Sequence, residues 1–103
     1  MDLEHNGKII KAESRHGYGI RQFDDGSQYE GIWQNNMPNG QGIFKFTNGD
    51  VYKGTFYNGM SHGKGELTKA NKDTYKGDFV ENMPSGHGIY AYSNGSLYAG
   101  EFK

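Results

Sequence analysis

A motif of tyrosine, glycine and a large aromatic residue returns along this chain at a constant interval of 23 residues. It reads Tyr-x-Gly-x-Trp or Tyr-x-Gly-x-Phe and starts at Tyr29, Tyr52, Tyr75 and Tyr98. A second motif, Gly-x-Gly, keeps the same interval and starts at Gly40, Gly63 and Gly86. Residues 29–51 and 75–97 are identical at 10 of 23 positions. Periods of roughly 20–50 residues are the signature of repeat architectures, so we interpret the chain as an array of equivalent units.

Each unit has the pattern of a β-hairpin. Side chains alternate between the two faces of a strand, so Tyr29, Gly31 and Trp33 share one face. In the return strand, the alternation places four residues on one face: Gly40, Gly42, Phe44 and Phe46. A ring from a neighbouring strand can lie over a glycine because no Cβ blocks it. The composition agrees, since the 17 glycines and the 15% of aromatic residues are typical of turns and sheets. We therefore predict an all-β fold without helices.

Two kinds of turn are expected to alternate along the array. Tight hairpin turns, which need a residue with positive φ, are predicted at Asp25-Gly26, Asn48-Gly49 and Asn94-Gly95. Lys72 follows Asn71 at the glycine position of the remaining unit, so strain or a different turn is expected there. On the opposite edge, longer turns are expected at residues 36–39, 59–62 and 82–85, where proline, if present, presets φ.

The period divides the chain into unequal parts. Residues 29–51, 52–74 and 75–97 form three full repeats, and residues 98–103 are interpreted as the first strand of a truncated repeat. Residues 1–28 are interpreted as a degenerate N-terminal capping repeat, because Gly17-Tyr18-Gly19 is in phase but Asn6-Gly7-Lys8-Ile9-Ile10 replaces the aromatic motif. Terminal repeats are often atypical because one side faces water. Nine strands spaced ~4.8 Å apart predict a ribbon roughly 40 Å long.

Composition and motifs argue against catalysis or metal binding by this chain. The net charge of −1 provides no field to attract nucleic acid, and the lack of cysteine excludes thiolate chemistry and cysteine-based zinc sites. His16 and His62 share a position that asparagine or serine fills elsewhere, so we interpret them as turn residues. Equivalent positions of successive units lie roughly 10 Å apart, too far for histidines there to share a metal ion. We predict no catalytic residue, no metal and no cofactor.

The aspartates of the turns have a structural interpretation. Asp24, Asp25, Asp50 and Asp73 lie where carboxylates commonly accept hydrogen bonds from nearby backbone amides. The charged N-terminal segment lacks the apolar run of a signal peptide, and no stretch approaches the ~20 apolar residues of a membrane span. A soluble cytoplasmic protein is the default prediction, with association with the cytoskeleton or a membrane left open.

The two motifs and their period resemble the MORN family, whose name stands for membrane occupation and recognition nexus. The resemblance is good over residues 29–103 and weak over residues 6–28. It implies a single-layer antiparallel β-meander of successive hairpins, without catalysis of its own. Members of the family occur in ciliary and junctional membrane proteins and as accessory regions of phosphoinositide kinases. A fold this widely used does not determine the function.

This chain departs from the common family pattern after the first strand. Many MORN units continue with Gly-Lys, whereas this chain has Asn36-Met37, Gly59-Met60 and Asn82-Met83. Asparagine can adopt the left-handed conformation that glycine would take. The missing lysines weaken the case for phospholipid binding, although Lys45, Lys53, Lys64 and Lys76 leave a local basic patch open. The three methionines predict a soft, adaptable apolar edge.

The aromatic face has two interpretations. Rings stacked along the sheet form the core, yet a single layer leaves part of the aromatic surface for a partner. Phe44, Phe46, Tyr90 and Tyr92 stand where Arg21, Phe23, Leu67 and Lys69 stand in other units, which favours these variable positions as a partner footprint. The predicted partner is a protein that lies along this face as an extended peptide or a helix. The candidate binding residues are Tyr29, Trp33, Phe44, Phe46, Tyr52, Phe56, Tyr75, Phe79, Tyr90 and Tyr92.

The last motif predicts an edge strand that could pair with another chain. Free backbone groups of an edge strand template such pairing, so a homodimer or the capture of a partner strand is expected there. Lys8 and Lys11 lie on the N-terminal edge, where their charges disfavour such pairing. The candidate edge residues are Tyr98, Ala99, Gly100, Glu101 and Phe102. Two other functions stay open, a membrane or phosphoinositide module and an accessory region of a larger enzyme.

Overall fold

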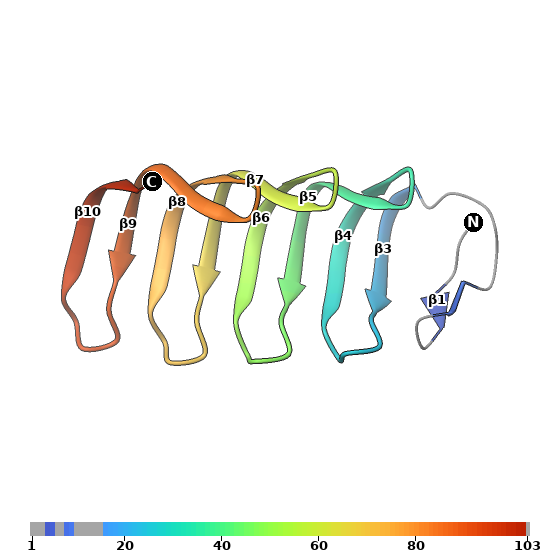
Figure 1. Cartoon of the computed structure of the whole chain (residues 1–103), viewed down its shortest axis with the longest axis horizontal. Coiled ribbons are helices and arrows are strands. Elements are labelled where there is room, and N and C mark those ends of the chain that lie inside the picture. The colour runs from blue at the N-terminus through green and yellow to red at the C-terminus, as the bar shows by residue number, and fades with distance from the viewer. Residues whose placement is uncertain (1–3, 6–7, 10–15, 103) are drawn as a thin grey trace.

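The computed structural model describes residues 4–5, 8–9 and 16–102, and these residues form β-strands and turns without a helix. Two short strands pair with each other, β1 (Glu4–His5) and β2 (Lys8–Ile9). The other eight form one antiparallel sheet in chain order: β3 (Gly17–Gln22), β4 (Gln28–Gln34), β5 (Met37–Lys45), β6 (Val51–Tyr57), β7 (Met60–Thr68), β8 (Thr74–Val80), β9 (Met83–Ala91) and β10 (Leu97–Phe102). Figure 1 shows this meander, which confirms the predicted fold class.

The main sheet has eight strands, so the prediction of nine was wrong. Lys8–Ile9 pairs with Glu4–His5 instead of joining β3, and this segment lacks the Tyr-x-Gly-x-aromatic motif that joins the other units. Asn6, Gly7, Ile10 and Lys11, which the sequence placed in this segment or on its edge, lie outside the described residues. The longest dimension of the molecule, 47 Å, runs across the strands (Figure 1).

The lengths of the two kinds of turn are the reverse of the prediction. The Met-x segments belong to strands, and the turns before them are two-residue connections whose residues both have positive φ: Asn35 and Asn36, Asn58 and Gly59, and Glu81 and Asn82. Two residues with positive φ match the twist of paired strands, which makes this the tightest hairpin connection. The loops with Asp-Gly or Asn-Gly are longer, as in the loop that Phe23 N and Ser27 O close at 2.8 Å.

Lys72 carries backbone strain, as expected. Its φ is +81°, and the glycines at the same position of the neighbouring loops, Gly49 and Gly95, have φ of +99° and +97°. Lys72 N donates a hydrogen bond to Lys69 O at 2.8 Å, and Gly49 N donates to Phe46 O at 3.1 Å. The loop therefore keeps the same turn although a side chain occupies a position suited to glycine.

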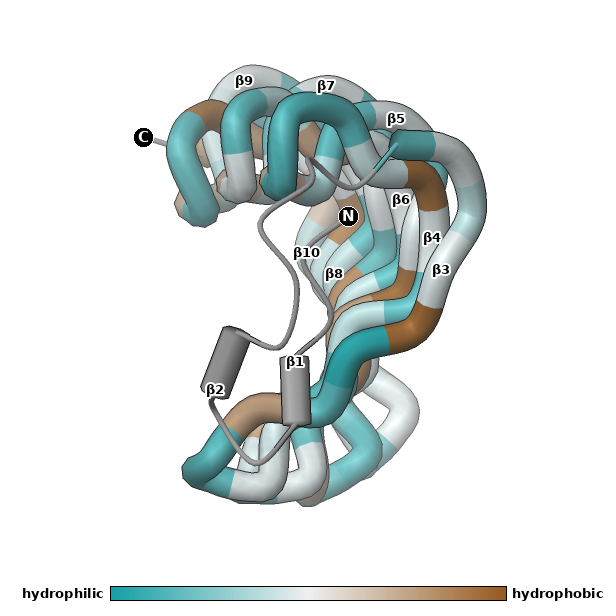
Figure 2. Tube along the Cα trace, turned by 90° about the vertical axis from the view of Figure 1, so that its right-hand side faces the viewer, coloured by the Kyte–Doolittle hydropathy of each residue, from teal (hydrophilic) through white to brown (hydrophobic). Residues whose placement is uncertain are grey.

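A β-bulge in each hairpin bends the sheet. Gly31 pairs with Gly42 and Trp33 with Pro38, so the single residue Ile32 on β4 faces three residues on β5. The same shift recurs between β6 and β7 and between β8 and β9. Bulges bend strands and increase their twist. Viewed end-on in Figure 2, the sheet is curved like the letter C.

The bulge also explains the first glycine of each Gly-x-Gly motif. Gly40 has a φ of +104°, and a Cβ there would lie 3.2 Å from the Cβ of Ile32. The prediction that Gly40 shares the aromatic face was therefore wrong, because strict alternation breaks at the bulge. The second glycine fits the prediction, since a Cβ on Gly42 would lie 2.3 Å from the hydroxyl oxygen of Tyr29, whose ring covers it.

The core is a continuous row of aromatic rings. Tyr29 contacts Trp33 of its own strand and Phe56 two strands away, with centroid distances of 5.0 and 4.9 Å and interplanar angles of 88° and 84°. Such edge-to-face pairs stabilise beyond the area they bury, by about 0.5–1.5 kcal/mol each. Every tyrosine of the row also donates its hydroxyl to the carbonyl oxygen three residues ahead, as Tyr29 does to Ile32 at 2.8 Å. The row comprises Trp33, Tyr29, Phe56, Tyr52, Phe79, Tyr75, Phe102 and Tyr98.

Candidate functional site

An apolar groove of about 320 Å³ lies on the aromatic face, over the middle of the sheet. Its residues come from β5, β6, β7 and β8 and from the turns that join or follow them. Buried rings of the core form its floor, and half-buried or exposed side chains form its sides. The groove is lined by Phe44, Phe46, Asp50, Tyr52, Phe56, Gly59, Ser61, Leu67, Phe79 and Asn82.

The groove is located where one repeat departs from its neighbours. Gly59 stands at the position of Asn36 and Asn82, and a Cβ on Gly59 would meet no atom within 4 Å. Ser61 replaces the proline of the other repeats, and Leu67 replaces an aromatic residue. All three substitutions are to smaller side chains, so space remains between the two curved edges of the sheet. Three of the residues that line the groove, Gly59, Ser61 and Leu67, are thus particular to this repeat.

The predicted binding residues fall into two groups. The motif rings are buried, with exposed fractions of 0 to 5%, so they form the core and offer little surface: Tyr29, Trp33, Tyr52, Phe56, Tyr75 and Phe79. Tyr52, Phe56 and Phe79 are the three that line the groove. The variable rings are more accessible. Phe44 and Tyr90 are half-buried, whereas Phe46 and Tyr92 are each 43% exposed. Phe44 and Phe46 pack together at 4.7 Å beside the groove, and Tyr90 and Tyr92 form the same pair in the last full repeat, away from it.

The edge strand holds the remaining candidates. Tyr98, Ala99 and Glu101 are exposed, and Gly100 and Phe102 are half-buried. β10 pairs with β9 from Leu97 to Phe102, and in the described part of the chain β10 has no second neighbour. The ring of Tyr98 is 47% exposed, whereas the equivalent Tyr29 is fully buried, because a following strand covers Tyr29.

Carboxylates connect neighbouring loops at one edge of the groove. Asp50 accepts a hydrogen bond from Ala70 N at 2.9 Å, and Asp73 accepts one from Ser93 N at 2.7 Å. The amide of Ser93 and the hydroxyl of Tyr90, at 2.9 Å, lower the pKa of Asp73 because they stabilise its ionised form. Asp25, Asp50 and Asp73 thus accept hydrogen bonds from backbone amides as predicted, and Asp50 and Asp73 also join adjacent repeats.

Burial shifts the pKa of two tyrosines of the core. Loss of hydration raises the pKa of both Tyr29 and Tyr52 to about 12. These hydroxyls therefore stay neutral at physiological pH. They serve as hydrogen-bond donors within the core.

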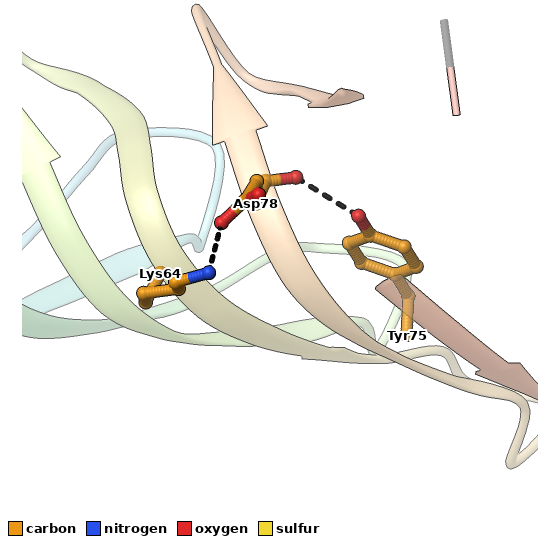
Figure 3. Close-up of polar contacts among 3 residues, drawn as sticks. All are labelled: Lys64, Tyr75 and Asp78. Atoms are coloured by element: carbon orange, nitrogen blue, oxygen red, sulfur yellow. Dashed lines mark hydrogen bonds and ion pairs between the residues drawn. The ribbon is translucent and has the colours of Figure 1, made fainter. Parts of the chain in front are cut away.

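The opposite face of the sheet carries charges of both signs on neighbouring strands. Glu66 faces Lys53 on one side and Lys76 on the other in the strand register. Lys64 Nζ lies 2.5 Å from Asp78 Oδ1, and the Tyr75 hydroxyl donates to the backbone oxygen of Asp78 at 2.9 Å (Figure 3). Lys64 lowers the pKa of the Asp78 carboxyl through this contact. Opposite charges beside each other leave little net field on this face.

Sequence reasoning missed part of the groove. Gly59, Ser61 and Asn82 were interpreted as turn residues, and Asp50 as a residue of a loop. The signal was present in the repeat itself, because Gly59, Ser61 and Leu67 break the pattern together in one unit. Within residues 16–102, no three histidine, aspartate or glutamate side chains are close enough to hold a metal ion. The same residues contain no helix of the length and apolarity needed to cross a membrane.

An open meander of equivalent hairpins with a groove on its curved face defines a β-repeat protein. The family model for the MORN repeat matches residues 15–28, 29–51, 52–74 and 75–97. The chain therefore belongs to the MORN-repeat family, whose repeats are usually interaction modules for proteins or membranes and are generally non-catalytic. None of the curated proteins compared with the chain matches it.

Proposed function

We propose that this chain is a non-catalytic adaptor that binds a segment of a partner protein in the groove on its aromatic face. The observation that carries the proposal is the groove itself, about 320 Å³ in volume and lined mainly by phenylalanine, tyrosine and leucine side chains. Its sides include Phe46, which is 43% exposed. Exposed apolar surface rimmed by polar residues is typical of interaction sites. A groove along a sheet suits an extended peptide or one face of a helix.

The arrangement of charges favours a protein partner over an anionic membrane. Lys64 is paired with Asp78, and Glu66 separates Lys53 from Lys76. A membrane-binding surface needs several basic residues whose charge is not neutralised, each contributing about 1 kcal/mol near an anionic surface. The aromatic groove, by contrast, contains no lysine or arginine among its described lining residues.

The test uses random 15-residue peptides displayed on phage and selected on the immobilised chain. The matched variants are Leu67→Tyr, which fills the groove with the residue type found at Tyr90, and Ile89→Lys, which changes an exposed residue of the opposite face. Both variants should keep the thermal unfolding transition of the parent. Peptides selected on the parent should bind Ile89→Lys equally well and lose binding to Leu67→Tyr. Equal binding to all three, or failure to enrich any peptide, would refute the groove as the binding site.

A further inference from the structure

Two aspartates at equivalent positions differ in the hydrogen bonds that the rest of the chain donates to them. Asp73 receives hydrogen bonds from Ser93 N at 2.7 Å and from the Tyr90 hydroxyl at 2.9 Å. Asp50, one repeat earlier, receives the corresponding backbone bond from Ala70 N at 2.9 Å, but position 67 is leucine. Its Oδ2 atom accepts a hydrogen bond from Asn48 Nδ2 at 3.4 Å, which is close to the distance limit of a hydrogen bond. One oxygen of Asp50 is therefore weakly bound within the chain.

This carboxylate lies at the groove. Asp50 is the one acidic or basic residue among the described residues that line it, and Phe44, Phe46 and Leu67 line the same groove. A negative charge beside aromatic rings suits a cation that has an apolar stem and a flat charged end. The arginine side chain has this form, because its planar guanidinium binds carboxylates with two donors and stacks on aromatic rings.

The chain itself contains a guanidinium stacked on an aromatic ring. The guanidinium carbon of Arg21 lies 4.4 Å from the centroid of the Phe23 ring, which occupies the same position in its repeat as Phe46. Cation–π contacts of this kind are attractive, and more so the further the cation is desolvated. The rings that line the groove can thus hold a guanidinium as well as an apolar group.

We infer that the groove selects partner segments through an arginine whose guanidinium pairs with Asp50 and stacks on Phe44 or Phe46. The inference rests on the proposed function, since it specifies the chemistry of the segment that the groove binds. Leucine at position 67 and aspartate at position 50 act together: leucine leaves the space, and aspartate supplies the charge. The neighbouring repeat does not offer this site, because Tyr90 both fills the space and donates to Asp73.

The experiment compares pairs of peptides from the phage selection. One peptide contains arginine, and its twin contains citrulline, which has the same shape without the charge. Their dissociation constants are measured by fluorescence anisotropy against the full chain, Asp50→Asn and Asp73→Asn. Asparagine at position 50 keeps an acceptor for Ala70 N, so the loop is preserved. Asp73→Asn is the matched control, since Asp73 is already engaged by Tyr90.

The expected result is enrichment of arginine in the selected peptides and weaker binding of the citrulline twin to the parent by about tenfold, as for the loss of a hydrogen-bonded charge. The same exchange should change binding to Asp50→Asn by less than about twofold and should keep its tenfold effect on Asp73→Asn. Selected peptides without arginine, or a citrulline effect that is absent from the parent or unchanged in Asp50→Asn, would overturn the inference. If Leu67→Tyr still abolished binding in that case, the proposed function would stand and only the arginine would be rejected.

Discussion

At the scale of single residues, the glycines of the motif have separate roles that one strand pattern cannot distinguish. Gly42 lies under the ring of Tyr29, Gly40 forms the bulge, and Gly31 faces the backbone of β5 across the strand pair. The sequence predicts the first role, because alternation alone places a glycine beside a ring. It does not predict the second, because a bulge shifts the register without a change in composition.

Gly54→Val tests the third role, because Gly54 stands one repeat after Gly31. A Cβ on Gly54 would lie 2.6 Å from Gly65 Cα and 2.6 Å from Lys64 O, and backbone atoms cannot move aside cheaply. We expect the variant to lose about 1–3 kcal/mol of unfolding free energy in urea titrations. Gly95→Asn is the control, because the position is open and asparagine tolerates its φ of +97°. A valine variant as stable as the parent would contradict the close approach of β6 and β7.

Lys72→Gly should stabilise the chain. Glycine adopts a φ of +81° without the cost that lysine bears there, although it also makes the unfolded chain more flexible. The net gain should be about 0.5–1 kcal/mol in the free energy of unfolding. Ala70→Gly in the same loop, at ordinary negative φ, should instead destabilise by about 0.4–1 kcal/mol. Two changes of the same sign would show that the strain at Lys72 does not affect stability.

At the scale of the hairpin, the sequence predicted strands better than it predicted turns. The residues of β4, β6, β8 and β10 follow from the aromatic motif, and the all-β class follows from its repetition. The turns were reversed because Met-Pro resembles a turn signal, whereas Asn35 and Asn36 hold the positive φ values. A proline is tolerated in β5 at Pro38, which pairs with Trp33 just beyond the bulge. Pairing register, which decides such cases, depends on contacts between strands and cannot be obtained from one strand alone.

The contact between adjacent loops predicts a pH dependence. The pKa of Asp73 is lowered in the folded chain by the Ser93 amide and the Tyr90 hydroxyl. Its stabilising contribution is therefore complete above the usual pKa of 3.8 and is lost as the pH falls through the lower folded value. Asp73→Asn should be less stable than the parent near neutral pH, with a smaller loss of stability on acidification below about pH 4. Thermal unfolding between pH 2 and 7 checks this, and parallel curves for the two proteins would contradict it.

At the scale of the whole molecule, the repeats contact only their neighbours in the row of rings. Deletion of residues 52–74 joins Val51 to Tyr75 and restores the sequence phase of a strand start. The shortened chain should keep its β-sheet circular dichroism, since repeat arrays are stabilised by nearest-neighbour contacts. The slope of its unfolding free energy against urea concentration should fall roughly in proportion to the number of residues removed. An unfolded product would mean that the array is not built from equivalent units.

The charge pairs of the outer face lead to a prediction about membranes. At ~0.15 M salt, where screening acts over ~8 Å, vesicles rich in acidic phosphoinositides should not sediment the chain more than neutral phosphatidylcholine vesicles do. The physical reason is that Lys64 and Lys53 each lie beside a carboxylate. Salt-sensitive sedimentation that Lys53→Gln and Lys76→Gln remove would favour the membrane module instead.

The motif alone does not predict the groove, because the groove depends on residues at positions that the motif does not specify. The sequence does show that position 67 is leucine where other repeats carry arginine, phenylalanine or tyrosine. Only the curved sheet brings Leu67 opposite Ser61 and Gly59, which belong to the other edge. The curvature in turn comes from the bulges, which composition does not reveal. Sites built from differences between repeats therefore need the register before they can be recognised.

The 23-residue period also sets a regular spacing of equivalent positions across the sheet. Each repeat adds two strands, so equivalent points recur every ~9.6 Å across the sheet. A helix laid along this axis returns to the same side every seven residues, or ~10.5 Å. The two spacings differ by ~0.9 Å per repeat, so a straight helix would be out of step by ~3 Å after three repeats. A polyproline II segment returns to the same side every three residues, or ~9.3 Å, and stays closer in step, so a longer array of this kind would match extended chains of that form better than helices.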